Sequence, residues 1–215
     1  MSEYEKLIEK ILSHFAGEDF KGELVRAKKE FFESSVTLDE NSGAYDLRMS
    51  QFYDWYFFSR ELSGFRQTPL SACLLVRELR FSELELKQLE ALKNHRHSLF
   101  EFIKTKGSDV YIKDLLANKK LVVKSSPWIF GFDEEELFEA RLLPHEDTYV
   151  FTRGFCFHPG LAKKFILDEV KRHQKDPDLD PGVMMLRLMK MRFKYEQYKH
   201  VNPEMIYTND GMLGL

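Results

Sequence analysis

Hydrophobic residues recur with two different periods along this chain, and the period changes near residue 94. Before that point, apolar residues return every three or four positions, which is the spacing of amphipathic helices. The pattern predicts helices over about 2–15, 20–34 and 45–58, with a polar turn over 37–43. The third helix is apolar on nearly every face, so we expect Trp55 and Phe58 to be almost fully buried.

Two helix starts in the same half have recognisable caps. Thr68 and Pro69 match an N-cap followed by proline at the first helical position, and the helix they open is expected to run to Leu79. Ser82 and Glu85 have the spacing of a capping box and predict the start of a further helix.

The second half begins with a period of two, which is typical of strands. Leu99, Glu101 and Ile103 alternate with a second set of side chains, formed by Phe100, Phe102 and Lys104. Further strand-like runs cover 109–113, 121–123, 137–143 and 148–157, joined by short polar turns. We expect antiparallel pairing over 99–157, with a shared interior formed by Phe151, Phe155 and Phe157. Helical periodicity returns over about 161–173 and 180–200.

These patterns together predict an α+β fold. Helices form the N-terminal region 1–94, and a small antiparallel β-sheet or SH3-like partial barrel covers about 98–158 within the region 95–158. C-terminal helices and a tail occupy 159–215. At 215 residues, we expect the three regions to pack as one compact unit.

Composition narrows the class of protein. The net charge of −3 gives no global attraction to nucleic acid or to an anionic membrane, and 14% aromatic residues supply a large core. No apolar run is long enough to span a membrane, and the first residues lack the pattern of a signal peptide. Two isolated cysteines, Cys73 and Cys156, indicate reduced thiols and a cytoplasmic location.

Aromatic residues carry a resemblance to a known group. Phe52, Trp55–Tyr56 and Phe58, followed by 68–70 and by the run 140–144, resemble uncharacterised bacterial proteins with an aromatic helix and a compact β segment. The resemblance covers about 45–160. It implies the domain outline and no chemistry, because the cysteine-rich zinc motif that some such families carry does not occur here.

Catalytic and metal-binding interpretations have few residues to rest on. Cys156 and His158 share one face of a strand-like run and have the residue types of a nucleophile and its base. His145, Glu146 and Asp147 lie in a nearby turn and offer ligands for a divalent ion. No orienting residue, phosphate loop or nucleophile elbow accompanies them, so we assign no catalytic residue, metal or cofactor.

The last long helix is the candidate binding surface. Residues 183–200 contain five lysines and arginines and a single carboxylate, Glu196, so the local charge is 5 − 1 = +4. Candidate contacts for nucleic acid or another partner are Arg187, Lys190, Arg192, Lys194, Tyr198 and Lys199. In the interpretation that we favour, the apolar stripe of this helix docks on the core and the cations form its solvated opposite face.

Three functions therefore remain open. The first is a non-enzymatic cytoplasmic protein-interaction or scaffold module with a protein partner. The second is a nucleic-acid-binding protein that uses the small barrel and the basic helix 183–200. The third, an enzyme around Cys156 and His158, has the least support. We also expect Met212, Leu213 and Leu215 of the tail to dock in an apolar groove, either in cis or on a second copy to form a homodimer.

Overall fold

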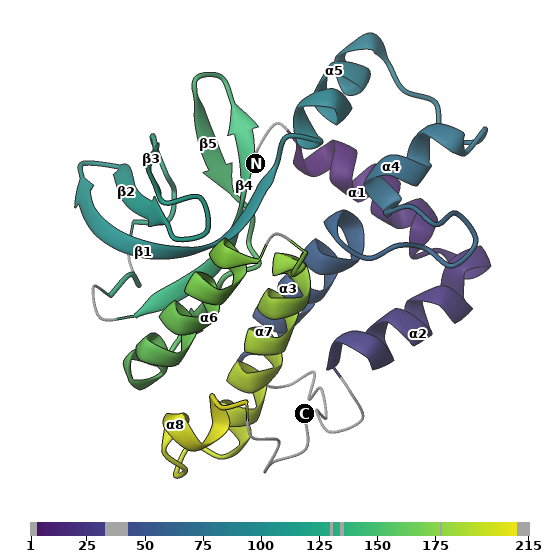
Figure 1. Cartoon of the computed structure of the whole chain (residues 1–215). Coiled ribbons are helices and arrows are strands. Elements are labelled where there is room, and N and C mark those ends of the chain that lie inside the picture. Colours follow the sequence, from purple (N-terminus) through teal and green to yellow (C-terminus); the bar gives the residue numbers. More distant parts are fainter. Residues whose placement is uncertain (1–3, 33–42, 130, 134–135, 177, 210–215) are drawn as a thin grey trace. The chain divides into compact units, whose positions relative to one another are not determined.

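The computed structural model in Figure 1 describes residues 4–32, 43–129, 131–133, 136–176 and 178–209. The chain divides into two compact units, and each is described by itself. Unit 1 is formed by Met1–Arg96 with two short pieces, Leu143–His145 and Thr152–Gly154. Unit 2 is formed by His97–Leu142, Glu146–Phe151 and Phe155–Leu215.

Helices come first in the chain, then strands, then helices again. The first group comprises α1 (Glu5–Phe15), η1 (Glu18–Phe20), α2 (Lys21–Phe32), α3 (Tyr45–Phe58), α4 (Pro69–Ala72), η2 (Cys73–Leu75) and α5 (Glu83–Leu92). The strands are β1 (Arg96–Lys106), β2 (Asp109–Asp114), β3 (Lys119–Val123), β4 (Leu137–His145), β5 (Thr148–Phe151) and β6 (Cys156–His158). The last group comprises η3 (Gly160–Ala162), α6 (Lys163–Lys175), α7 (Pro181–Gln197) and α8 (Pro203–Ile206).

The aromatic helix α3 is the centre of unit 1. Trp55 and Phe58 are 9% and 6% exposed, which confirms their predicted burial. The ring of Phe52 contacts the rings of Phe31 and Tyr56, and Tyr56 donates its hydroxyl hydrogen to the Phe15 carbonyl over 2.8 Å. A helix that is apolar on most faces therefore has neighbours on several sides.

A buried carboxylate is neutralised beside this core. Glu23 of α2 pairs with Arg60 over 2.5 Å and with Arg26, and it also accepts hydrogen bonds from Ser63. Burial raises the pKa of Glu23, but these hydrogen bonds outweigh the burial and lower the pKa to about 2. The cluster connects α2 to the turn that follows α3.

The predicted caps are confirmed, but one helix is shorter than expected. Ser82 and Glu85 form both hydrogen bonds of a capping box, and the Thr68 side chain caps the Ser71 amide. The helix that Thr68 opens, α4, ends at Ala72 and is followed by the 3-10 turn η2 as far as Leu75, so it does not reach Leu79. Val76 takes an extended conformation there, and its side chain is buried while those of the two preceding leucines stay exposed.

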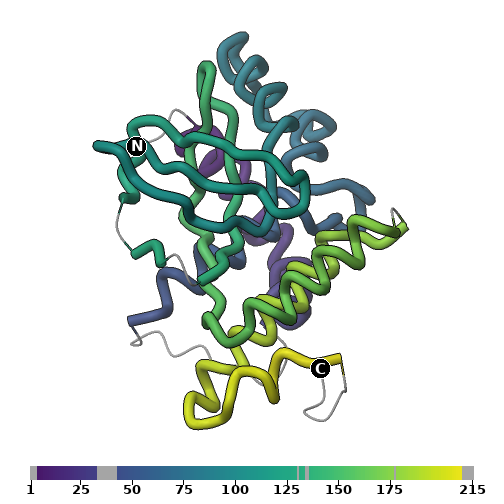
Figure 2. The backbone as a smooth tube through the Cα atoms, turned by 60° about the vertical axis from the view of Figure 1, so that its left-hand side comes forward, coloured from purple at the N-terminus to yellow at the C-terminus, as the bar shows by residue number. Residues whose placement is uncertain are grey.

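Unit 2 contains a curled antiparallel sheet, a half-barrel, in the order β3-β2-β1-β4-β5, with β6 paired to β4. Figure 2 shows β1, β2 and β3 running side by side. The α+β fold and the antiparallel half-barrel are therefore as predicted. The run 148–157 is wrong as one strand, because 152–155 separates β5 from β6. Gly154 passes so close to Asp54 that an added Cβ would lie 3.1 Å from the aspartate Cβ.

The two edge strands of the half-barrel meet through one hydroxyl. Thr148 of β5 donates to the Val122 carbonyl over 2.9 Å and accepts from the Lys124 amide over 3.1 Å. Lys124 also pairs with Asp147 over 2.6 Å. These contacts satisfy backbone groups that an open sheet edge would leave unpaired.

Phenylalanine rings fill the inner face of the half-barrel. Phe151 and Phe155 are buried, and Phe157 packs against them. The ring centroid of Phe155 lies 5.1 Å from that of Phe151 and 5.8 Å from that of Phe157. The predicted shared interior of these three rings is confirmed. Phe132 lies among them, with rings on several sides.

Helices cover part of the outer face. Leu99 and Leu137 of the sheet share a core with side chains of α6, α7 and α8, whose helices are shown in Figure 1. The last long helix ends at Gln197, slightly before the predicted end, and α8 was not predicted. The sequence does contain the start signal of α8, because the Asn202 side chain caps the Glu204 amide and Pro203 takes the first helical position.

Two further expectations concern the tail and the membrane. Met212, Leu213 and Leu215 lie outside the described residues, so their docking stays a prediction. Among the residues that the structure describes, no helix has the length and apolar character needed to cross a membrane.

Truncating Phe58 to alanine is expected to lower the free energy of unfolding by about 3–5 kcal/mol, because a buried ring leaves a cavity that its neighbours fill only in part. Denaturant titration monitored by circular dichroism measures the loss. Val25→Ala on the exposed side of α2 is the control and should change stability by less than about 0.5 kcal/mol. A loss below about 1 kcal/mol for Phe58→Ala would show that α3 is not central to the unit.

Candidate functional site

A single extra residue in β1 decides which lysines reach the outer face of the sheet. Phe102 pairs with Ile112, but the next pair joins Lys104 to Tyr111, so Ile103 forms a bulge. Side chains alternate along a strand, and a bulge shifts that alternation by one position. The sequence pattern grouped Lys104 with Phe102, and that grouping is wrong: the bulge turns Lys104 to the opposite face.

The register arranges the outer face of β1, β2 and β3 in rows. One row is formed by Glu101, Lys113 and Lys120, and the next by Lys104, Tyr111 and Val122. Lys106 lies opposite Asp109 in the third row. We call the four lysines of these rows the lysine face: Lys104, Lys106, Lys113 and Lys120.

The lysine face has little compensating charge. Within the described part of the chain, none of its four lysines forms an ion pair. Glu101 pairs instead with Lys163 of α6 over 3.1 Å, and Asp109 accepts a hydrogen bond from the Ser125 amide. Counting Lys163, this part of the outer face contains five lysines and two carboxylates. Its net charge is therefore 5 − 2 = +3.

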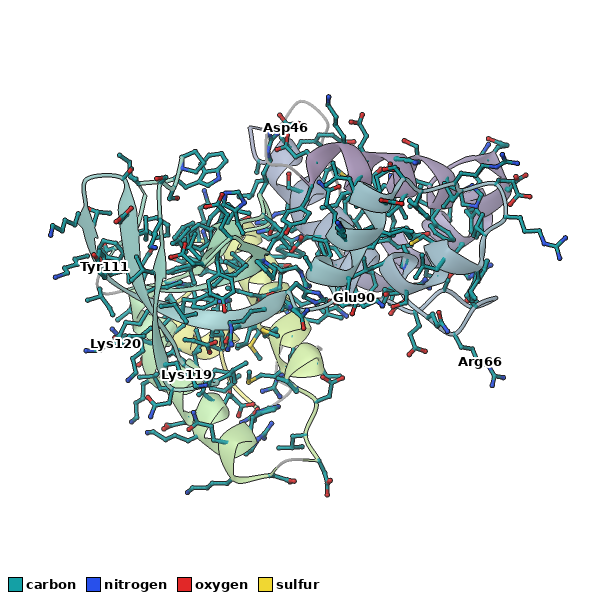
Figure 3. The ribbon with its side chains drawn as sticks, turned by 90° about the horizontal axis from the view of Figure 1, so that it is seen from above. Asp46, Arg66, Glu90, Tyr111, Lys119 and Lys120 are labelled. Atoms are coloured by element: carbon teal, nitrogen blue, oxygen red, sulfur yellow. The ribbon has the colours of Figure 1, made fainter. Side chains whose placement is uncertain are left out.

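An aromatic ring lies within the lysine face. Tyr111 is partly exposed, and the Lys104 ammonium lies 5.2 Å from the centroid of its ring. Figure 3 shows Tyr111, Lys119 and Lys120 along the outer margin of the strands. A cationic sheet face with an accessible ring has the chemistry for binding a polyanion that carries flat groups.

Sequence reasoning missed this surface, although a signal was present. Residues 104–124 contain six lysines and two aspartates, a local charge of 6 − 2 = +4, while the rest of the chain carries −3 − 4 = −7. The cluster is as strong as that of the last helix. It was overlooked because the lysines are spread over three strands, and only their pairing brings them together.

The basic residues of α7 are placed differently. Arg187 pairs with Glu169, and Arg192 pairs with Glu196 over 3.1 Å. Lys190 and Lys194 are partly buried, whereas Tyr198 and Lys199 are exposed beyond the end of the helix. The structure therefore does not gather the six predicted contacts on one solvated helix face, and their role in binding stays a prediction.

Glu169 explains why Arg187 is not available to a partner. This carboxylate of α6 is buried and is bound by Arg172 over 2.8 Å and by Arg187. Asn209 donates a further hydrogen bond over 3.3 Å. A buried carboxylate without cations would be strongly destabilising. Arg172 stabilises it from within α6, and Arg187 joins α6 to α7.

Cys156 and His158 lie in the core of unit 2. They are 1% and 0% exposed, and His158 Nδ1 lies 3.0 Å from the Tyr207 hydroxyl. Cys156 pairs in register with Glu139, which is buried and lies 2.7 Å from His97 Nε2. With both side chains sealed from solvent, the pair as folded presents no nucleophile to a substrate.

Burial, and next to it the positive charge of Arg192, lower the pKa of His158 to about 3. Among the described residues, its Nε2 atom has no hydrogen-bond partner. The imidazole is therefore neutral in the folded chain. No group of three or more histidine, cysteine, aspartate or glutamate side chains in the described ranges is arranged to hold a metal ion.

Lowering the pH from 7 to 5 is expected to reduce the free energy of unfolding by about 2 kcal/mol through His158. The histidine takes up a proton on unfolding below its ordinary pKa of 6.5, so the stability is present above pH 6.5 and falls as the pH approaches 3. Denaturant titrations at both pH values should show a smaller pH effect for His158→Gln. The exposed His200 gives the control, His200→Gln, which should behave as the wild type. Equal pH effects in all three proteins would contradict the assignment.

Comparison with known proteins gives a family but no activity. Neither a curated protein nor a solved structure matches the chain. The model of a family of unknown function, DUF7986, matches residues 2–182. This match covers most of the 215 residues, including unit 1 from residue 2 onward and the complete half-barrel. The chain therefore belongs to the DUF7986 family.

Proposed function

We propose that this chain is a non-enzymatic nucleic-acid-binding protein and that the lysine face is its binding surface. The observation that carries the proposal is the pairing of Lys113 directly opposite Lys120, while Glu101, the other neighbour of Lys113, forms its ion pair with Lys163. Like charges directly opposite each other destabilise a sheet. A bound polyanion would neutralise the two lysines and remove that repulsion, so binding would stabilise the sheet.

The spacing of the lysines suits a chain of phosphates. Neighbouring strands lie about 5 Å apart, and side chains on one face of a strand repeat about every 7 Å. Long lysine side chains add reach to this grid and act as point charges toward phosphate. Contacts of this kind position a nucleic acid without reading its sequence.

The charge of the remaining chain favours a defined orientation. Segment 104–124 carries +4 within a chain of net charge −3, so this segment attracts a polyanion while the rest of the chain is negative overall. One hypothesis from the sequence was a nucleic-acid-binding protein that uses the small barrel and the helix 183–200, and this proposal retains the barrel as the binding surface. The helix 183–200 is not retained, because its two arginines already have carboxylate partners.

Replacing Lys104, Lys113 and Lys120 with glutamine is expected to weaken nucleic-acid binding and its salt dependence together. Each lost phosphate contact should reduce the slope of log K against log salt by about 0.7 for a single strand, so the triple variant should lose about 2. Fluorescence anisotropy of a labelled oligonucleotide between about 50 and 200 mM salt measures both quantities.

A charge-matched variant separates this surface from a general charge effect. Lys6, Lys29 and Lys87 are exposed on helices of unit 1, and their replacement with glutamine removes the same charge elsewhere. That variant should keep the wild-type slope. Absence of binding at about 50 mM salt, binding insensitive to salt, or an equal loss in both triple variants would refute the proposal.

A protein partner is the second candidate function, and exposed leucines of unit 1 favour it. Leu74, Leu75, Leu84 and Leu86 are between 46% and 65% exposed within a segment of thirteen residues, 74–86. Exposed apolar side chains concentrated in this way are typical of interaction surfaces. An aliphatic segment of a partner would bury them.

Replacing Leu75 and Leu84 with serine is expected to abolish recovery of a stoichiometric partner in pull-downs from the native cytosol, with little change in stability, because neither leucine is part of the core. Val25→Ser, on another exposed position of unit 1, should leave recovery unchanged. Recovery of the same partner by all three proteins would show that the leucines do not form the contact.

We also propose a cytoplasmic location. Cys73 and Cys156 are buried thiols that form no disulfide, which fits a reducing compartment. The bacterial origin implied by the resemblance stays a prediction.

A further inference from the structure

We infer that the lysine face selects single-stranded over double-stranded nucleic acid, with Tyr111 as the platform on which a base stacks. The inference rests on the proposed function and specifies its ligand. A surface that binds phosphates alone needs only cations, and the ring within this array is a feature that such a surface does not require.

Tyr111 is placed for this role by the sheet. Its cross-strand neighbours on the outer face are Lys104 on one side and Val122 on the other, so the ring lies between a cation and an apolar side chain. Strand pairing on both sides holds the backbone of Tyr111 in place. An unstacked base needs a flat apolar surface with cations nearby for its phosphates, and this row supplies both.

The Lys104 ammonium shows that the ring can be reached by a ligand. It lies 5.2 Å from the ring centroid, in a cation–π contact made by a flexible, exposed side chain. Stacking of a base on an aromatic ring is stronger than an exposed cation–π contact. A base can therefore displace the ammonium from the ring, and the lysine then has a phosphate to bind.

A duplex cannot use the ring in the same way. Its bases are stacked on each other inside the helix, so only phosphates meet the lysine face. Binding of a single strand and binding of a duplex should thus both depend on the lysines, whereas only single-strand binding should depend on Tyr111. This difference separates the inference from the proposal on which it rests.

The experiment uses the full chain with a labelled single strand of about 16 nucleotides and the corresponding duplex. Tyr111→Leu keeps an apolar side chain but removes the ring, and it is expected to weaken single-strand binding by about 5- to 100-fold while duplex binding stays unchanged. Tyr111→Phe keeps the ring and should bind both ligands as the wild type does. Thermal melts of the two variants confirm that each is folded.

The outcomes separate the two ideas. If Tyr111→Leu weakens both ligands equally, or neither, while the variant with Lys104, Lys113 and Lys120 replaced still loses affinity, the stacking role is wrong and the phosphate surface remains. A Tyr111→Phe variant as weak as Tyr111→Leu also overturns the stacking role. If the wild-type chain binds neither ligand at about 50 mM salt, the proposed function fails, and the inference fails with it.

Discussion

Alternation of side chains across the curled sheet is the constraint on which the rest of unit 2 depends. Each strand sends successive residues to opposite faces, so one face must be apolar and the other is free to vary. Phenylalanine rings fill the inner face, and they include Phe100, Phe138 and Phe151. The outer face is divided: α6, α7 and α8 pack on the part near Leu99 and Leu137, and lysines occupy the rows toward β3.

The bulge at Ile103 makes this division possible. Without the extra residue, Lys104 and Lys106 would share a face with Phe102 and would meet the phenylalanine core. Unpaired charges cannot be placed in such a core without a large cost. The bulge turns both lysines outward while the strand continues to pair with β2. Bulges of this kind recur beside functional sites because they redirect side chains without ending a strand.

Charged residues of the chain fall into two classes. The buried carboxylates Glu23 and Glu169 are each bound by two arginines, and these clusters connect helices within their units. The lysine face has no such partners within the described residues. This contrast directs attention to the sheet rather than to α7.

Local patterns in the sequence determined much of the architecture. The capping box at Ser82 and the burial of Trp55 follow from neighbours only a few positions away, as do the change from helical to strand periodicity and the shared interior of Phe151 and Phe155. The fold class was predictable for the same reason, since each element carries its own periodicity. Membership of the family adds no chemistry to this picture.

Long-range pairing decided the remainder. The bulge at Ile103, the break between β5 and β6, and the pairing of Arg187 with Glu169 each depend on residues distant in sequence. A one-residue shift in register moves every following side chain to the other face, and hydrophobic periodicity does not reveal where such a shift occurs. The sequence therefore determined which elements form, while only the tertiary structure decided which lysines share a surface and which cations are already paired.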